Sequence, residues 1–382
     1  MAKGVVFEEV GASPREASTT PAPGPARRGD SASARAAIAA WLWGLAALVA
    51  LMVLIGGMTR LTDSGLAITV WEPVMGAIPP LSDADWEAAF QAYKTTTEFQ
   101  EQNDWMTLAD FKPLYWWEWG HRQFGRLIGL VWAVGLGVFL VRRMVPRGWT
   151  PRLILPGVLG GLQGAIGWWM VSSGLVGRLD VASYRLALHL GLAFVIFGLL
   201  VWLALRIRLD EKALLQARRR RADGPSGIGL LSVFAVFAFL QILVGALVAG
   251  IDAGRGYVDW PLMQGHFLPP ESFDLVPFWR NFFENPALVQ FVHRMLGYLV
   301  LGMGLWTAWR LWGLRRPGLR FAGPLLGLAV LGQTVLGIVT VVHAAAPGIA
   351  IWHQGGALVL AALVVWAAYL LRFPPEQRIA RA

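Results

Sequence analysis

The sequence predicts an all-α integral membrane protein with eight transmembrane helices, arranged as two pseudo-symmetric four-helix bundles. Three observations support this prediction: an apolar composition, long uncharged segments and an internal repeat. Hydrophobic residues make up 56% of the chain and charged residues only 15%, whereas a soluble domain has about a quarter charged residues. This composition excludes a water-soluble enzyme and a disordered chain. The absence of cysteine excludes disulfides, thiolate-held iron–sulfur clusters, covalent CxxCH haem attachment and cysteine nucleophiles.

The uncharged segments give the number of helices, because a membrane-spanning helix needs about 20 mostly apolar residues. Two runs that are too short become long enough when each is extended back through a preceding His-Arg pair. The long uncharged segment near the C-terminus holds two helices and a tight hairpin. The predicted helices span residues 37–58, 120–141, 153–173, 185–206, 227–250, 291–310, 321–341 and 351–371.

Lysine and arginine are unevenly shared between the two sets of loops. The tails and the loops on one side hold 23 of the 33 basic residues, against 7 on the other side. Basic residues concentrate on the cytoplasmic side of short loops, so both termini are predicted to be cytoplasmic. The run from Arg218 to Arg221 is the strongest element. Next to a helix, such a run is more often a topology anchor than an RNA-binding site, and we expect no nucleic-acid partner.

Motifs of the first half recur in the second half in the same order. They are an Asp-x-Gly followed by a tryptophan, a His-Arg pair, and a histidine in the last helix of each bundle. The matched positions are Asp63 and Asp252, Trp71 and Trp260, His121 and His293, and His189 and His353. Both halves begin on the same side, so the repeat is parallel, unlike the inverted repeats of many transporters. A transporter with parallel repeats stays an alternative.

The repeat divides the chain into segments with distinct expected roles. The predicted segments are a disordered cytoplasmic tail (1–36), an N-terminal bundle (37–206), an Arg-rich cytoplasmic linker (207–226), a C-terminal bundle (227–371) and a second cytoplasmic tail (372–382).

Four of the six histidines occupy matched positions, two in each bundle. The predicted helices place His121, His293 and His353 in or near a first helical turn, and His189 about one turn deeper. An ionisable residue within a span is costly and indicates function, and two histidines from facing helices can hold both axial positions of a haem iron. The expected pairs are His121 with His189 and His293 with His353. The alternative is helix–helix hydrogen bonding; zinc is disfavoured, because the loops offer no further ligands at zinc spacing.

An acidic residue breaks the repeat beside one of these pairs. Glu118 lies three residues before His121, on the same helical face, whereas the matched residue of the second half is Gln290. One site is therefore expected to carry out proton-coupled chemistry while the other holds its haem. The alternative is a carboxylate favoured by the helix dipole at an N-terminus. The partners of Arg122, Arg126 and Arg294 stay open. They could pair either with haem propionates or with acidic side chains.

These residues resemble the haem A synthase family, of the type found in proteobacteria and mitochondria. The resemblance rests on the stretch from Gly56 to Pro80, the Glu118-to-Arg126 motif, and the His-Arg and Trp-His motifs at His293 and His353. It covers about 37–371. Some members carry a cysteine pair in the first outer loop, which this chain lacks, so a thiol-redox role for that pair is absent.

The resemblance implies oxidation of a methyl group of haem O to a formyl group, giving haem A for terminal oxidases. It implies Glu118 as the catalytic acid or base, His121 and His189 at the substrate haem, and His293 and His353 as axial ligands of haem b. Expected partners are the lipid membrane, haem O synthase, an electron donor (ferredoxin-like or a quinol) and a second copy of the chain. The expected location is the bacterial inner membrane rather than the mitochondrial one.

A different class of protein fits the same histidines. A di-haem b-type cytochrome that oxidises quinol needs the four histidines equally well, but it does not need Glu118. It would hold two identical haems, so the mass of the extracted haems separates the two hypotheses, while a visible spectrum excludes a transporter.

Overall fold

A computed structural model of the chain describes residues 29, 31–72, 74–222 and 227–375. Within this part of the chain there is no β-strand, and eight helices are long and apolar enough to cross a membrane, which confirms the predicted fold class. They are α1 (Ala32–Leu61), α3 (Leu108–Val141), α4 (Thr150–Gly174), α5 (Ser183–Ile207), α7 (Ile228–Gly250), α10 (Pro286–Gly313), α11 (Leu319–Val342) and α12 (Pro347–Arg372). The predicted tails lie mostly outside the described residues.

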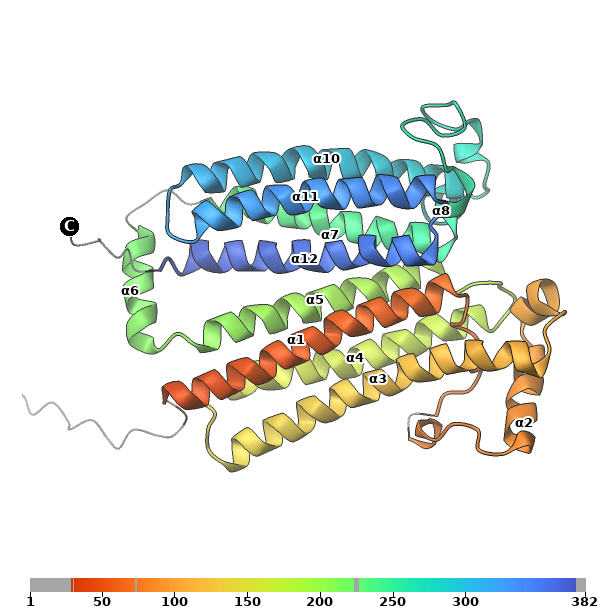
Figure 1. Ribbon diagram of the computed structural model, residues 1–382, viewed down its shortest axis with the longest axis horizontal. Helices are drawn as coiled ribbons and strands as arrows, with labels where there is room; N and C mark the ends of the chain where they lie inside the picture. Colours follow the sequence, from red (N-terminus) through yellow and green to blue (C-terminus); the bar gives the residue numbers. More distant parts are fainter. Residues whose placement is uncertain (1–28, 30, 73, 223–226, 376–382) are drawn as a thin grey trace, which may run out of the picture.

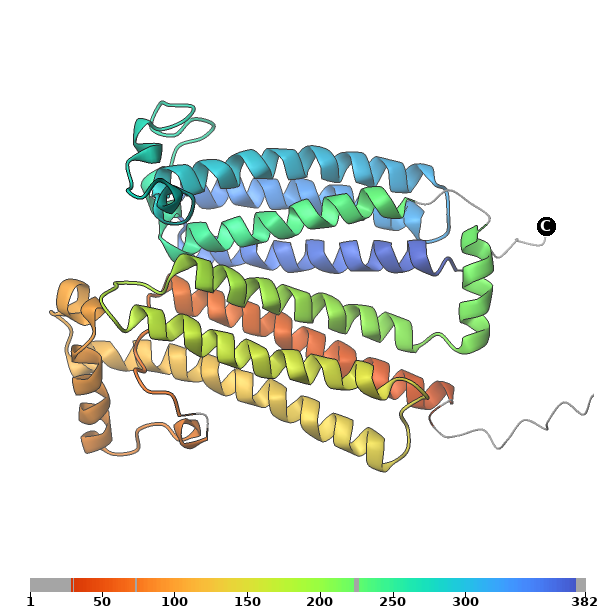
Figure 2. The ribbon, with the colours of Figure 1, turned by 180° about the vertical axis from the view of Figure 1, so that it is seen from behind.

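The helices form two groups that lie side by side (Figure 1, Figure 2). One group holds α1, α3, α4 and α5, and the other holds α7, α10, α11 and α12. The groups meet where α1 and α5 pack against α7 and α12. Each group has its own buried apolar core, centred on residues such as Leu42 and Leu200 in the first and Phe234 and Leu326 in the second.

The helices that carry the histidines begin earlier than the sequence predicts. α3 begins at Leu108 instead of residue 120, behind a capping box formed by Thr107 and Asp110, and α10 begins at Pro286 behind the cap of Asn285. The prediction that His121, His293 and His353 lie in or near a first helical turn is therefore wrong, most clearly for His121. The reason is physical: a capped helix continues past the apolar segment into polar residues.

Shorter elements cover both ends of the molecule. At the outer end, as the charge rule assigns it, lie α2 (Asp83–Lys94), α8 (Ala253–Gly256), α9 (Asn281–Glu284) and the short turns Met75–Ala77, Phe99–Asn103, Pro270–Phe273 and Phe278–Arg280. At the other end, α6 (Glu211–Ala222) runs across the ends of the bundles (Figure 1). The Arg-rich linker therefore contains a helix, and this helix carries the arginine run.

Polar contacts join the two bundles. The Arg60 guanidinium lies 2.5 Å from a carboxylate oxygen of Asp63, 3.2 Å from Asp180 and 2.9 Å from Asp252, which belongs to the second half. Because Arg60 supplies positive charge among the three carboxylates, the cluster is an ion network and needs no metal. Deeper in the interface, the Gln354 amide of α12 donates to the Val53 carbonyl of α1 at 2.9 Å.

Candidate functional site

Each of the four matched histidines faces a glycine on the preceding long helix. A Cβ atom added to any of these glycines would press against the imidazole ring, so glycine is what leaves room for each ring beside the neighbouring helix. The distances from such a Cβ are 3.0 Å for Gly56 to His121 Nε2, 2.8 Å for Gly167 to His189 Cε1, 3.0 Å for Gly245 to His293 Cε1, and 3.0 Å for Gly337 to His353 Cε1.

Three of the four histidines also receive a glutamine from the same neighbouring helix. Each glutamine amide donates to the backbone carbonyl of its histidine, which fixes that turn against the neighbouring helix. The distances are 3.0 Å from Gln163 to His189, 3.0 Å from Gln241 to His293 and 2.9 Å from Gln333 to His353. Every one of these glutamines precedes the facing glycine by one helical turn.

The fourth position departs from this pattern. One turn before Gly56, where the other helices have glutamine, the chain has Met52. The Met52 methyl group lies against Gly125 of α3, and in the second bundle Gln241 lies against the matching Gly297 of α10. A thioether accepts hydrogen bonds weakly and donates none, so the His121 carbonyl lacks the amide donor that the other three histidines have. The environment of His121 is therefore the least like the others.

In the second bundle the two imidazoles lie at about the separation that an iron between them would need. The ring centroids of His293 and His353 lie 6.5 Å apart, with planes at 84°. Two metal–nitrogen bonds of about 2 Å, plus about 1 Å from each nitrogen to its ring centre, add to about 6 Å. His293 Nδ1 is buried and has no hydrogen-bond partner. This pair fits axial ligation of one haem.

The first bundle holds the corresponding pair. His121 on α3 and His189 on α5 are close enough to interact electrostatically, and their glycine contacts match those of the second bundle. The structure thus brings the four predicted histidines together two by two, in the predicted pairs.

Glu118 is buried beside the first pair, one helical turn before His121. It is 2% exposed, and its carboxylate accepts from Arg122 Nη2 at 2.6 Å, from Arg122 Nε at 3.0 Å and from the Ile68 amide at 2.7 Å. Arg122 in turn donates to the carbonyls of Ile68 and Val70, at 2.9 Å and 3.1 Å. The two side chains therefore clamp the loop that follows α1. The dipole explanation is excluded, because Glu118 lies well beyond the first turn of α3.

The second half builds the same clamp without a carboxylate. Gln290 donates to the Tyr257 carbonyl at 3.1 Å, and Arg294 donates to the same carbonyl at 2.9 Å and to Gln290 at 3.3 Å. Tyr257 is the counterpart of Ile68, since each follows the repeated aspartate by the same interval. Holding the loop therefore does not by itself require a carboxylate.

The remaining arginine candidate lies next to this clamp. Arg126 donates to the Glu72 carbonyl at 2.8 Å, and Arg122 and Arg126 line a small cavity of about 120 Å³ under the loop. Of the partners expected from the sequence, Arg122 has an acid, Glu118, whereas Arg126 and Arg294 have backbone carbonyls.

Sequence analysis missed the facing glycines, Gln241 and Met52. The sequence does mark three of the four glycines, because Gln-x-x-x-Gly occurs in three long helices, each of which directly precedes a long helix that carries one of the histidines.

Residues 39–365 match the profile of the family described as cytochrome oxidase assembly protein. The chain is 56% identical to the heme A synthase of Ruegeria pomeroyi, covering 97% of both chains. It is 54% identical to the heme A synthase of Dinoroseobacter shibae, over 97% of this chain and 96% of the relative. Identity to the heme A synthase of Paracoccus denitrificans is 50%, over 99% of both.

Proposed function

The chain belongs to the family of cytochrome oxidase assembly proteins that contains the haem A synthases, and we propose on this premise which residues carry its reaction. It is a multi-pass membrane oxidoreductase of haem A biosynthesis that acts on haem O. The reaction converts a methyl group into a formyl group by two successive hydroxylations, followed by loss of water from a geminal diol.

Haem O is the substrate of the N-terminal bundle (37–206), held between His121 and His189. A haem b is the resident cofactor of the C-terminal bundle (227–371), held between His293 and His353. The 6.5 Å ring separation, the facing glycines and the unpartnered His293 Nδ1 support this assignment. When bound, the haem b supplies one-electron transfer toward the substrate site.

The residues of this chain fix both histidine pairs in place. The glutamine bonds to His189, His293 and His353 hold three of the imidazole-bearing turns. Gln163, Gln241 and Gln333 also approach the imidazole nitrogens at 3.2, 3.3 and 3.2 Å. Such contacts from outside the ligand set orient a ligand ring.

Glu118 is the catalytic acid or base of the reaction. Hydroxylation of the methyl carbon and the later loss of water both move protons, and a carboxylate one helical turn from a ligand histidine is placed to take or give them. Its ion pair with Arg122 keeps it oriented, with the Ile68 amide as third contact. One observation carries this assignment: the second bundle builds the same clamp with Gln290, so the carboxylate of the first bundle serves something besides holding the loop.

Topology, location and partners follow from the charge distribution and the family. Both termini lie in the cytoplasm and the chain lies in the bacterial inner membrane, because the 23 basic residues against 7 orient the spans. Haem O synthase, a ferredoxin-like or quinol electron donor and a second copy of the chain are the proposed partners.

The test is the chemical identity of the haems in the purified protein. Non-covalent haem is extracted from the chain expressed with haem O synthase, and the masses are determined. We expect haem b together with haem O, a hydroxylated intermediate or haem A. Two molecules of haem b, with no conversion of added haem O, would instead identify a di-haem electron-transfer cytochrome.

A further inference from the structure

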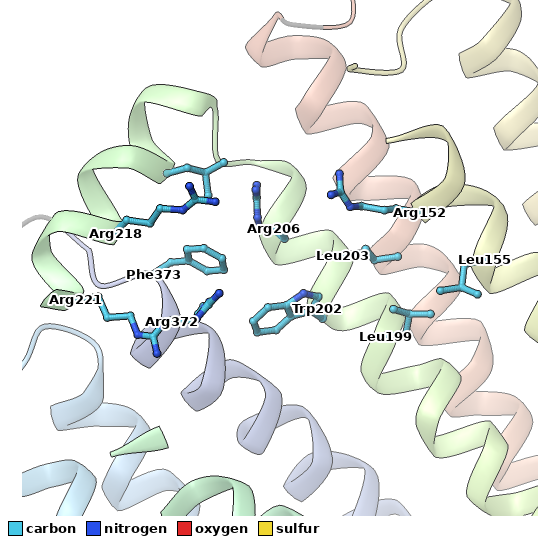
Figure 3. A pocket seen from close by; sticks show the side chains of 11 residues that line it. Arg152, Leu155, Leu199, Trp202, Leu203, Arg206, Arg218, Arg221, Arg372 and Phe373 are labelled. Atoms are coloured by element: carbon cyan, nitrogen blue, oxygen red, sulfur yellow. The ribbon is translucent and has the colours of Figure 1, made fainter. Parts of the chain in front are cut away.

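A cavity of about 930 Å³ lies at the cytoplasmic end of the molecule, remote from the histidines. Its walls come from α4, α5, α6 and the end of α12, so both bundles contribute to it (Figure 3). His189 is near the start of α5 and Arg206 near its end, which separates the two by about 25 Å at a rise of about 1.5 Å per residue. The cavity is therefore not part of the haem site.

Arginine side chains from all four of these helices line the cavity: Arg152, Arg206, Arg218, Arg221 and Arg372. No carboxylate lines it, and none of the five forms an ion pair with any residue that the structure describes. Arg152 and Arg218 are close enough to Arg206 for their charges to interact with it. Positive charge gathered in a partly enclosed space without counter-charge attracts anions.

Aromatic rings hold part of this charge in a fixed geometry. The guanidinium carbon of Arg206 lies 5.3 Å from the ring centre of Phe373 and 5.8 Å from that of Trp149, and Arg152 lies 5.5 Å from Trp149. Trp202 packs against Phe373 at 5.9 Å. An arginine stacked on a ring keeps the N–H groups of its planar fork available for the oxygens of a phosphate.

The remaining wall is apolar and leads into the membrane. Leu155 lies one turn deeper than Arg152 on α4, and Leu199 lies about two turns deeper than Arg206 on α5 (Figure 3). Leu155 is 43% exposed on the outer surface of its bundle, where the bilayer covers the helices. The cavity thus offers cations at the membrane surface and leucines below them, which matches a phosphate headgroup above acyl chains.

We propose that this cavity binds the headgroup of an anionic phospholipid, with a two-phosphate lipid of the cardiolipin class favoured by the five arginines. Basic pockets between transmembrane helices on the cytoplasmic side suit such headgroups, and the volume lies within the range of small-molecule sites. The headgroup supplies the missing counter-charge and links α6 and α12 to α4 and α5. It joins the bundles at the end opposite to the Arg60 network.

The test measures lipid binding to the full-length chain in detergent by native mass spectrometry. Cardiolipin, phosphatidylglycerol and phosphatidylcholine are added separately, and inorganic phosphate and glycerophosphate serve as soluble headgroup controls. We expect cardiolipin to bind at least tenfold more tightly than phosphatidylcholine, and the soluble phosphates not to compete at equal concentration. Equal retention of all three lipids, or full competition by inorganic phosphate, would overturn the proposal.

Matched variants separate a site from general surface attraction. Arg218→Gln with Arg372→Gln removes two cavity charges and should weaken cardiolipin binding at least tenfold. Arg219→Gln removes the same charge from the same helix outside the cavity, and should weaken it less than threefold. Arg152→Gln gives an independent cavity variant if the double variant fails to fold, as judged from its elution profile. An equal loss of cardiolipin binding in the Arg219 variant and in the cavity variants would refute the proposed site.

Discussion

Replacing Glu118 by glutamine separates its two roles, because glutamine keeps the shape and removes the titrating group. The structural cost is limited: the side chain keeps one carbonyl oxygen for the Ile68 amide or Arg122. Arg122 retains its bonds to the Ile68 and Val70 carbonyls, at 2.9 Å and 3.1 Å. Loss of one charge-assisted hydrogen bond costs about 1.5–3 kcal/mol, and the second bundle keeps its clamp with Gln290 at this position.

The catalytic cost should be larger and should appear in the products. A positioned acid or base contributes about 10²- to 10⁴-fold, which corresponds to about 3–5 kcal/mol in the barrier. Glu118→Gln should therefore insert normally, keep its b-type absorbance, and accumulate haem O or a hydroxylated intermediate while haem A falls by that factor.

The assay is the ratio of extracted haem A to haem O, identified by mass and normalised to the b-type absorbance of the same sample. Glu87→Gln is the matched control, because Glu87 is exposed on α2 at the same end of the molecule and loses the same charge. Haem A formation at the wild-type rate in Glu118→Gln would refute the reasoning and leave Glu118 as a loop clamp alone.

Three further predictions concern the cofactor, the topology and an outer loop. His353→Ala should lose tightly bound haem b while His343→Ala, exposed at the end of α11, keeps it; full b-type absorbance in the His353 variant would remove it as a ligand. A reporter that works only in the cytoplasm should be active after Ala382, and activity of a periplasm-only reporter there would contradict the orientation. Burial raises the pKa of Glu98, which lies between α2 and α3, from 4.5 to about 8. Because the folded state binds this proton more tightly, the stability that Glu98 contributes is fully present below about pH 4.5 and is lost as the pH rises through about 8. Thermal unfolding followed by tryptophan fluorescence should show a decline between pH 5 and 9 that is shallower in Glu98→Gln; equal slopes would show that Glu98 is not the cause.

The sequence was sufficient to predict the number of helices but insufficient for where they begin. A search for uncharged segments stops at the first charged residue, whereas α3 continues outward through Asp110, Lys112 and Glu118 because its capping box satisfies the first turn. Helix ends outside the apolar layer depend on caps and on contacts with loops, which an apolar run does not reveal.

The histidine pairs were predictable for a different reason: the repeat places chemically distinctive residues at equal intervals. The glycine that faces each histidine was only partly predictable: Gln-x-x-x-Gly recurs in three helices, but glycine is common in transmembrane helices and the residue it faces depends on how each helix is rotated. The contact between Glu118 and the Ile68 amide joins residues far apart in the chain, and no local pattern indicates it.

The contact between Gln354 and Val53 shows how the two halves of the repeat differ where they meet. The repeat relates α1 to α7 and α5 to α12, so the contacts of α1 with α12 and of α5 with α7 are copies of each other across a pseudo-twofold axis, as in an isologous homodimer. The two copies differ in their side chains. Gly57 leaves room for Gln354, since a Cβ there would lie 1.8 Å from its Oε1.

The matching positions in the other copy hold Ala246 and Leu190, which belong to one apolar cluster. Two N-terminal halves would therefore place Leu190 against Gly57 at both seams, and two C-terminal halves would place Gln354 against Ala246. At these positions each half therefore complements the other half better than it complements itself. The pairing of the two halves is asymmetric here, just as Glu118 and Gln290 make the surroundings of the two histidine pairs different.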